Sequence, residues 1–185
     1  ELHYIPSRKL SMYVRAKIEN KQENNTAESN MINYLQIRNK QNYRYHIAYQ
    51  ITPTLSLKNR FEYVIYTKGE SKSNHGYLVY QDASYKPKKF PVSFNMRYAI
   101  FNTDSYNAAL YAYESDVLYA YSVPSYYYKG SRAFIVLKYH ISRNLDFWLR
   151  YSRTYYTNKD VIGSGLTEIQ GSHKSEFKAQ IRLRF

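Results

Sequence analysis

The chain of 185 residues has no cysteine, a single tryptophan, six glycines and five prolines. The absence of cysteine excludes disulfide bonds and thiolate metal sites. No run of apolar residues approaches the roughly 18 that a transmembrane helix needs, and no segment shows a helical period. Nor does the chain open with the basic and then apolar residues of a signal peptide. Because residues 1–5 already read as part of a strand, we expect a mature product or a portion of a longer protein.

Tyrosine and positive charge are abundant instead. The chain holds 24 tyrosines and carries a formal net charge of +13. A tyrosine ring with its polar tip suits strands, membrane interfaces and binding faces. The charge favours anionic partners such as nucleic acid, lipid headgroups or acidic ligands. The mean hydropathy of −0.67 does not exclude a membrane protein built from strands, since every second residue of such strands faces water or a lumen.

The last ten residues, 176–185, carry the clearest pattern, because apolar and polar side chains alternate strictly and so lie on opposite faces of a strand. The apolar face carries Phe177, Ala179, Ile181, Leu183 and Phe185. A strand of this length that ends on an aromatic residue is typical of the closing strand of an outer-membrane β-barrel. We therefore expect this face to meet outer-membrane lipid and this strand to be recognised by the barrel-assembly machinery. A soluble β-sandwich can also end on such a strand.

The same alternation recurs along the chain, and the connections between the alternating segments differ in length. The alternating segments are 10–21, 42–51, 55–65, 92–100, 133–141 and 145–154, and residues 76–85 are a further strand whose two faces the sequence does not distinguish. The short turns are 6–9, 52–54, 86–91 and 142–144, and the long polar loops are 22–37, 67–75 and 157–172. Outer-membrane barrels have short periplasmic turns and long external loops in this way. A sandwich would show more Gly and Pro turns at shorter spacing.

Residues 102–132 have the least regular pattern. We expect two strands here, 106–113 and 117–126, with a tight turn at 114–116 and a connection at 127–131. The total is then about ten strands plus the stub 1–5. The predicted fold is an all-β, antiparallel, up-and-down transmembrane β-barrel. Residues 1–185 form a single barrel domain or the C-terminal portion of a larger one.

Basic residues gather on the polar faces of these strands. They are Arg15, Lys17, Arg44, Lys58, Arg60, Arg97, Lys138, Arg150, Lys178, Arg182 and Arg184. The acidic residues on the same faces are Glu19, Glu62, Asp146 and Glu176. One interpretation is a net-basic lumen that attracts anions. The other is a ladder of cross-strand ion pairs that fills the interior and holds the strands together.

Other polar groups give weaker indications. His3, His46, His75, His140 and His173 share no ligand spacing, so we expect neither a metal site nor a cofactor.

Three acidic residues, Asp104, Glu114 and Asp116, could activate a water for hydrolysis together with a histidine. Roles in turns at strand ends explain them more simply, and we assign no catalytic residue.

Tyrosines 126–128, next to Lys129 and Arg132, mix aromatic and basic side chains as a platform for single-stranded nucleic acid would. An aromatic girdle at a membrane interface explains the same tyrosines. Lysines in the turn 86–89 could contact lipid phosphates.

Six sequence motifs occur in order: YQDASYKPKKFP (80–91), RYAIFNTD (97–104), YAYESDVLY (111–119), KGSR (129–132), DFWLRY (146–151) and IGSGLTEI (162–169). With them, residues 55–185 resemble the C-terminal part of a family of Bacteroidota helix-hairpin-helix domain-containing outer-membrane or cell-envelope proteins. The resemblance implies a β-barrel-like segment in the cell outer membrane, with residue 1 in mid-barrel. The family's helix-hairpin-helix part, which implies DNA handling, is absent from this chain, so nucleic acid is a partner only by analogy. Thr167 and Gln170 stand where the family pattern has acidic residues, which puts a cation site in that loop in doubt.

The function expected from these observations is non-enzymatic: an envelope channel, uptake or assembly component, working alongside other envelope subunits. Two alternatives stay open. One is an outer-membrane hydrolase with its active site at the barrel rim, and the other is a soluble β-domain that binds polymers through its tyrosines.

Overall fold

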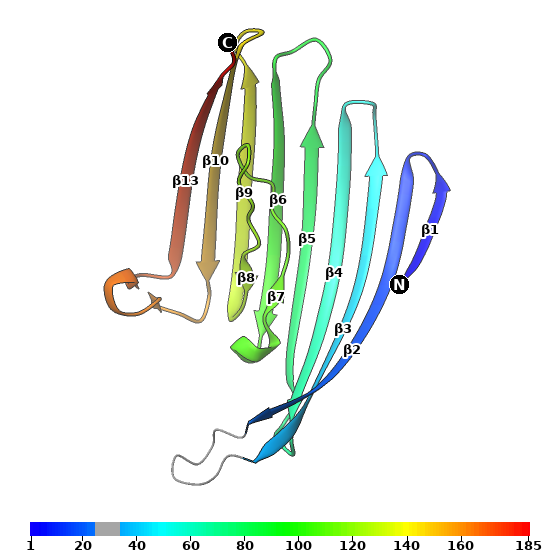
Figure 1. The fold of residues 1–185 in the computed structure, drawn as a ribbon, viewed down its shortest axis with the longest axis vertical. Helices are drawn as coiled ribbons and strands as arrows, with labels where there is room; N and C mark the ends of the chain where they lie inside the picture. The colour runs from blue at the N-terminus through cyan, green and yellow to red at the C-terminus, as the bar shows by residue number, and fades with distance from the viewer. Residues whose placement is uncertain (25–33) are drawn as a thin grey trace.

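Nine strands form one antiparallel sheet in the computed structural model, which describes residues 1–24 and 34–185. Their order, β1-β2-β3-β4-β5-β6-β9-β10-β13, follows the chain, so the topology is up-and-down (Figure 1). The all-β, antiparallel, up-and-down expectation is confirmed. The strands β1 and β13 are the two edges, and no pairing joins them within the described residues.

The strands of the sheet are β1 (Leu2–Ser7), β2 (Leu10–Asn24), β3 (Leu35–Gln50), β4 (Leu55–Lys68), β5 (Asn74–Tyr85), β6 (Val92–Thr103), β9 (Lys129–His140), β10 (Leu145–Tyr156) and β13 (His173–Leu183). The remaining elements are short: the 3₁₀ turns η1 (Tyr106–Ala108) and η2 (Gly165–Thr167), and the two-residue strands β7 (Leu110–Tyr111), β8 (Ser125–Tyr126), β11 (Val161–Ile162) and β12 (Ile169–Gln170). No helix of the described residues has the length and apolar character needed to cross a membrane.

The turns expected to be short lie at one end of the sheet and the loops expected to be long lie at the other (Figure 1). One expected long loop, 67–75, is short, because β4 continues to Lys68 and β5 begins at Asn74. The turn between β3 and β4 is closed by Thr52, whose hydroxyl accepts a hydrogen bond from the Leu55 amide at 3.0 Å. The expected loop 22–37 is shorter than predicted, because β2 continues to Asn24 and β3 begins at Leu35. Its centre, 25–33, lies outside the described residues.

The two strands expected at 106–113 and 117–126 do not join the sheet. Instead, β6 pairs directly with β9, and residues 104–128 run back across one face of the sheet. We refer to these residues as the covering segment; it contains η1, β7 and β8. The flanking strands β6 and β9 run in opposite directions, which is compatible with two further strands between them or with none. Strand direction alone therefore could not exclude the two extra strands. The connection expected at 127–131 is also wrong, since β9 already begins at Lys129.

The core lies between the covering segment and the middle of the sheet. It is formed by the buried side chains of Val64, Leu78, Tyr80, Ala99, Phe101, Ala108, Leu110, Ala112, Tyr126 and Tyr156. Gly76 permits this close approach, because a Cβ atom there would lie 2.5 Å from the carbonyl oxygen of Ala108. Small side chains at 108, 109 and 112 let the backbone of the covering segment lie close to the strands.

The two faces of the sheet differ in polarity. The face beneath the covering segment, the charged face, includes Glu62, Arg97, Asp146 and Arg150, all buried. The opposite face, the apolar face, carries large hydrophobic side chains exposed along the strands. They include Val14, Ile18, Tyr45, Phe61, Val79, Tyr98, Ile100, Ile135, Tyr151, Phe177, Ile181 and Leu183. The apolar alternation expected for 176–185 is present in β13, with Phe177 and Ile181 66% and 68% exposed, although the strand ends at Leu183.

Candidate functional site: the charged face and the covering segment

The strand register places the basic residues predicted from the sequence on one face. Arg15 lies opposite Arg44, and Arg44 lies opposite Glu62. Further along the sheet, Lys58 lies opposite Asp82, which lies opposite Arg97. Residues that lie directly opposite one another on adjacent strands point to the same side of the sheet. The same reasoning places Arg60, Lys138, Arg150, Lys178 and Arg182 on this face. Lys17 lies two residues from Arg15 on β2 and so points to the same side. Arg184 contacts Asp146 of this face.

Ion pairs occupy most of these basic residues. Arg44 donates from Nε and Nη2 to the Glu62 carboxylate at 2.8 and 3.0 Å. Arg97 makes the same two-fold contact with Asp82 at 2.6 and 2.8 Å. Carboxylates also lie within ion-pair distance of Arg15, Lys17, Arg60, Arg150, Lys178, Arg182 and Arg184. In the part of the chain that the structure describes, Lys58 and Lys138 have none. The ladder of ion pairs therefore accounts for most of the charged face.

Glu114 of the covering segment supplies negative charge to a sheet face on which basic residues outnumber acidic ones. Arg132 donates to its two carboxylate oxygens from Nε and Nη2 at 2.7 and 2.9 Å. Arg150 donates to Oε2 at 2.6 Å, and the Tyr126 hydroxyl donates to Oε1 at 2.7 Å. Glu114, Arg150 and Tyr126 are all fully buried. Each carboxylate oxygen therefore has two partners, and this offsets the cost of taking the charges out of water.

Asp116 extends the same network to the edge of the sheet. Its Oδ2 accepts a hydrogen bond from Nζ of Lys178 at 2.9 Å, and its Oδ1 lies 3.7 Å from Nε of Arg150. Arg150 also lies 3.4 Å from Glu176 on β13. Arg150 thus joins the covering segment, β10 and β13 in one cluster.

The acidic residues considered for hydrolysis are not brought together. Asp104 lies at the start of the covering segment, where its carboxylate accepts a hydrogen bond from the His75 backbone amide at 2.8 Å. Glu114 and Asp116 are held by arginine and lysine instead of facing a histidine. Asp116 has the expected turn role, because its carboxylate accepts a hydrogen bond from the Val117 amide at 2.8 Å beside the turn at 117–120. Glu114 does not have that role, because it is fully buried among its ion-pair partners. Within 1–24 and 34–185, no three His, Asp or Glu side chains form a group that could hold a metal ion.

Of tyrosines 126–128, only Tyr126 is removed from any exposed aromatic surface. Tyr126 is buried in the core, where burial and then the charge of Glu114 raise the pKa of its phenol, so it stays a hydrogen-bond donor. Tyr127 and Tyr128 pack against each other and against Tyr156. The ammonium group of Lys159 lies 4.4 Å from the centre of the Tyr128 ring. The girdle interpretation is therefore wrong for Tyr126.

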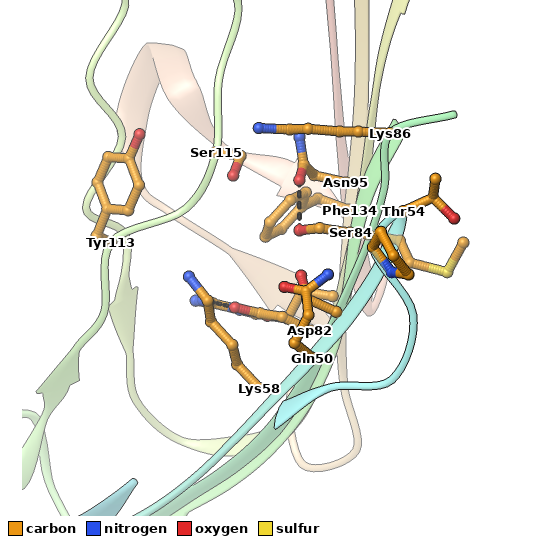
Figure 2. Close-up of a pocket in the computed structure, with 14 residues that line it drawn as sticks. Gln50, Thr54, Lys58, Asp82, Ser84, Lys86, Asn95, Tyr113, Ser115 and Phe134 are labelled. Carbon is orange, nitrogen blue, oxygen red and sulfur yellow. Dashed lines mark hydrogen bonds and ion pairs between the residues drawn. The ribbon is translucent and has the colours of Figure 1, made fainter. Parts of the chain in front are cut away.

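Three polar cavities flank the covering segment. The first, of about 360 Å³, lies near the short-turn end and is lined by residues that include Lys58, Lys86, Asn95 and Tyr113 (Figure 2). The second, of about 350 Å³, shares Lys86 and Asn95 with the first and extends to Lys138 and Trp148. The third, of about 220 Å³, lies toward β2 and β3 beside Arg15, Lys40 and Tyr111. The covering segment therefore divides the space above the charged face into small polar compartments.

One signal in the sequence could have located the covering segment. The polar faces of the predicted strands carry eleven basic and four acidic residues, so compensating carboxylates were to be expected from outside the strands. Glu114 and Asp116 supply them.

Comparison of the chain with protein-family models, curated proteins and solved structures gave no match.

Proposed function

We propose that the chain forms part of the wall of a transmembrane β-barrel in the cell outer membrane, with its apolar face toward lipid and its charged face toward the lumen. The observation that carries the proposal is the inverted polarity of the sheet. Ile18 and Ile181 are 63% and 68% exposed, whereas Asp146 and Arg150 are fully buried. A water-soluble domain covers its large apolar side chains and rarely buries charge to this extent. A wall between lipid and a polar interior has the polarity found here.

Strand length supports the same proposal. The eight long strands have between 11 residues, in β13, and 16 residues, in β3. A tilted strand needs about 9 to 11 residues to cross the hydrocarbon core of a bilayer. The strands are thus long enough to cross it, and the long ones extend beyond it at the end with the longer connections.

Strand direction bears on how the wall is completed. Each strand runs antiparallel to its neighbour, so β1 and β13, the first and the ninth, run in the same direction. If these two edges paired directly, their junction would be parallel. A wall that is antiparallel throughout requires an odd number of further strands between β13 and β1. We therefore propose that these nine strands are part of a larger barrel.

A groove on the apolar face is consistent with lipid contact. It has a volume of about 470 Å³, and its lining residues include Ala83, Ala133, Tyr98 and Tyr151. Its walls are largely apolar, with Met96 and Ile135 beside the alanines. A lipid acyl chain fits such a groove better than a polar polymer does.

The position of the covering segment supports a particular role for the proposed barrel. It is held across the charged face by Glu114 and Asp116, so it narrows the proposed lumen and leaves compartments that are small and polar. We propose a non-enzymatic channel, uptake or assembly component that works with other envelope subunits. No arrangement around Glu114 or Asp116 favours the hydrolase alternative, because arginine and lysine occupy both carboxylates.

Heat-modifiability tests the barrel proposal. The natural precursor, extracted from outer membrane in mild detergent, is expected to migrate faster on a gel before boiling than after it. No shift in mobility, together with extraction of the protein by salt washes alone, would contradict the membrane assignment. The exposed tyrosines of the apolar face, such as Tyr98 and Tyr151, would then be the surface of a soluble polymer-binding domain.

A further inference from the structure

The first polar cavity, near the short-turn end, combines unpaired positive charge with hydrogen-bonding groups. It lies between the charged face of β4 to β6 and the part of the covering segment around Tyr113 and Ser115. In Figure 2 the side chains of Lys58 and Lys86 extend from the sheet toward that segment. The volume of about 360 Å³ falls within the range of small-molecule sites, about 300 to 1,000 Å³.

The charges that line the cavity do not cancel. Lys58, Lys86 and Arg97 are cationic, and Asp82 is the one carboxylate among the lining residues. Asp82 is already engaged by Nε and Nη2 of Arg97 at 2.6 and 2.8 Å. Neither lysine has a carboxylate within ion-pair distance in 1–24 or 34–185. The positive charges of the two lysines are thus left available to an anion.

A second, independent feature also indicates a missing partner. The Arg97 side chain is 4% exposed, and its Nη1 atom is buried with no hydrogen-bond partner among the described residues. A buried guanidinium N–H without a partner is costly, because it has lost its water without gaining an acceptor. An oxyanion in the cavity that Arg97 lines would offer such an acceptor.

The neutral polar groups fit a ligand that carries hydroxyls as well as charge. Ser84 donates its hydroxyl hydrogen to Oδ1 of Asn95 at 2.5 Å, which orients the Asn95 amide so that its NH₂ group is free to donate. Gln50 uses its own NH₂ group on the carbonyl oxygens of the β3–β4 turn, which leaves its Oε1 as an acceptor. Tyr113 presents a half-exposed ring at the opposite side of the cavity, as Figure 2 shows. Donors, an acceptor and an aromatic ring around one space are the groups that bind a sugar ring.

We propose that this cavity binds a small polyhydroxylated anion, such as an acidic sugar or a sugar phosphate. Lys58, Lys86 and Arg97 bind its carboxylate or phosphate, and Asn95, Gln50 and Tyr113 bind the hydroxylated ring. The site depends on the charged face and the covering segment alone. It therefore does not require that the apolar face meet lipid, and it stands or falls separately from the barrel proposal.

Calorimetric titration of the natural precursor in mild detergent tests the site. The probes are glucose 6-phosphate, glucuronate, glucose and inorganic phosphate. Saturable binding of at least one of the two sugar anions is expected, with glucose and inorganic phosphate at least tenfold weaker. Binding of inorganic phosphate as tight as that of the sugar anions would overturn the hydroxyl part of the assignment. Binding of none of the four would overturn the site.

A double variant, Lys58→Gln with Lys86→Gln, is expected to raise the Kd of the bound sugar anion at least tenfold. The matched control is Lys72→Gln with Lys174→Gln, which also removes two positive charges from exposed lysines, as Lys58 and Lys86 are, but from lysines that do not line the cavity. Its Kd should stay within twofold of the unaltered protein. An equal loss in both double variants would show that only the overall field attracts the anion, and would overturn the cavity assignment. A circular dichroism spectrum unchanged from that of the unaltered protein verifies that each variant is folded, whether or not the protein is a barrel.

Discussion

Nη2 of Arg150 lies 2.6 Å from Oε2 of Glu114, and neither side chain has any exposed surface. The two residues come from β10 and from the covering segment, so their contact joins the sheet to the segment that crosses it. A buried ion pair is stable only where its remaining donors and acceptors are also satisfied. Arg132 and Tyr126 donate the remaining hydrogen bonds to the Glu114 carboxylate. The Ser115 carbonyl accepts a hydrogen bond from Nε of Arg150 at 3.2 Å.

The first prediction concerns this anchor. Glu114→Gln keeps the shape of the side chain but removes the carboxylate that Arg132 contacts and leaves Arg150 only the more distant Asp116 and Glu176, at 3.7 and 3.4 Å. Removal of one partner from a buried pair costs about 3 to 5 kcal/mol. We expect a loss of this size in the free energy of unfolding in detergent and urea, together with faster protease cleavage within 104–128. Glu70→Gln is the control, because Glu70 is exposed and has no ion pair among the described residues. Equal stability of the two variants would mean that Glu114 does not anchor the segment.

The second prediction concerns the apolar face. Leu149 points to this face near the middle of β10, whereas Gln180 of β13, opposite the neighbouring Trp148, points to the charged face. If the apolar face meets the bilayer midplane, Leu149→Arg should lower the free energy of unfolding in lipid by about 2 to 4 kcal/mol. Gln180→Arg should cost far less, because its side chain enters a polar space. Similar losses for the two variants would contradict the lipid-facing assignment. The same ordering is expected for Ile181→Arg, which lies nearer the short turns.

The sheet was predictable from the sequence because its signal is local. Alternation along 92–100 or 145–154 depends only on neighbouring residues, and it assigned both strands and their two faces correctly. Turn positions followed from Pro and polar clusters in the same way. The buried Glu62, Val64 and Tyr66 of β4 lie on the face that the pattern marks as polar, a face that the covering segment partly covers.

The covering segment was not predictable because its contacts are distant in sequence. Glu114 meets Arg150 across 36 residues, and Asp116 meets Lys178 across 62 residues. Its tyrosines resemble those of the strands in composition, so 106–113 and 117–126 read as two more strands. Only the excess of basic over acidic residues on the strand faces indicated that carboxylates must come from elsewhere.

The third prediction concerns the close contact at Gly76. A methyl group there would lie 2.5 Å from the carbonyl oxygen of Ala108, so backbone must shift. Overpacking of this kind costs about 1 to 3 kcal/mol. We expect Gly76→Ala to lower the free energy of unfolding by this amount and to expose the region around η1 to protease. Ala179→Val adds volume at an exposed position on the apolar face and should change stability by less than about 0.5 kcal/mol. A neutral Gly76→Ala would mean that the segment does not lie against β5.

The fourth prediction concerns closure of the wall. The chain has no cysteine, so a disulfide in a variant with two introduced cysteines shows that those two positions lie close together. A disulfide requires Cα atoms within about 7 Å. Cysteines at Leu149 and Ala179, which lie opposite each other on β10 and β13, should form a disulfide in the natural precursor and serve as the positive control.

The edges give the informative pairs. A cysteine at Leu2 or Tyr4 of β1, combined in turn with one at Phe177, Ala179 or Ile181 of β13, should form no disulfide. The reason is that, in the proposed wall that is antiparallel throughout, an odd number of other strands separates two edges that run in the same direction. A disulfide at any of these pairs would establish a direct parallel junction, and the nine strands alone would then close the wall. Protection of both edge strands from hydrogen exchange without such a disulfide would instead require that further strands pair with them.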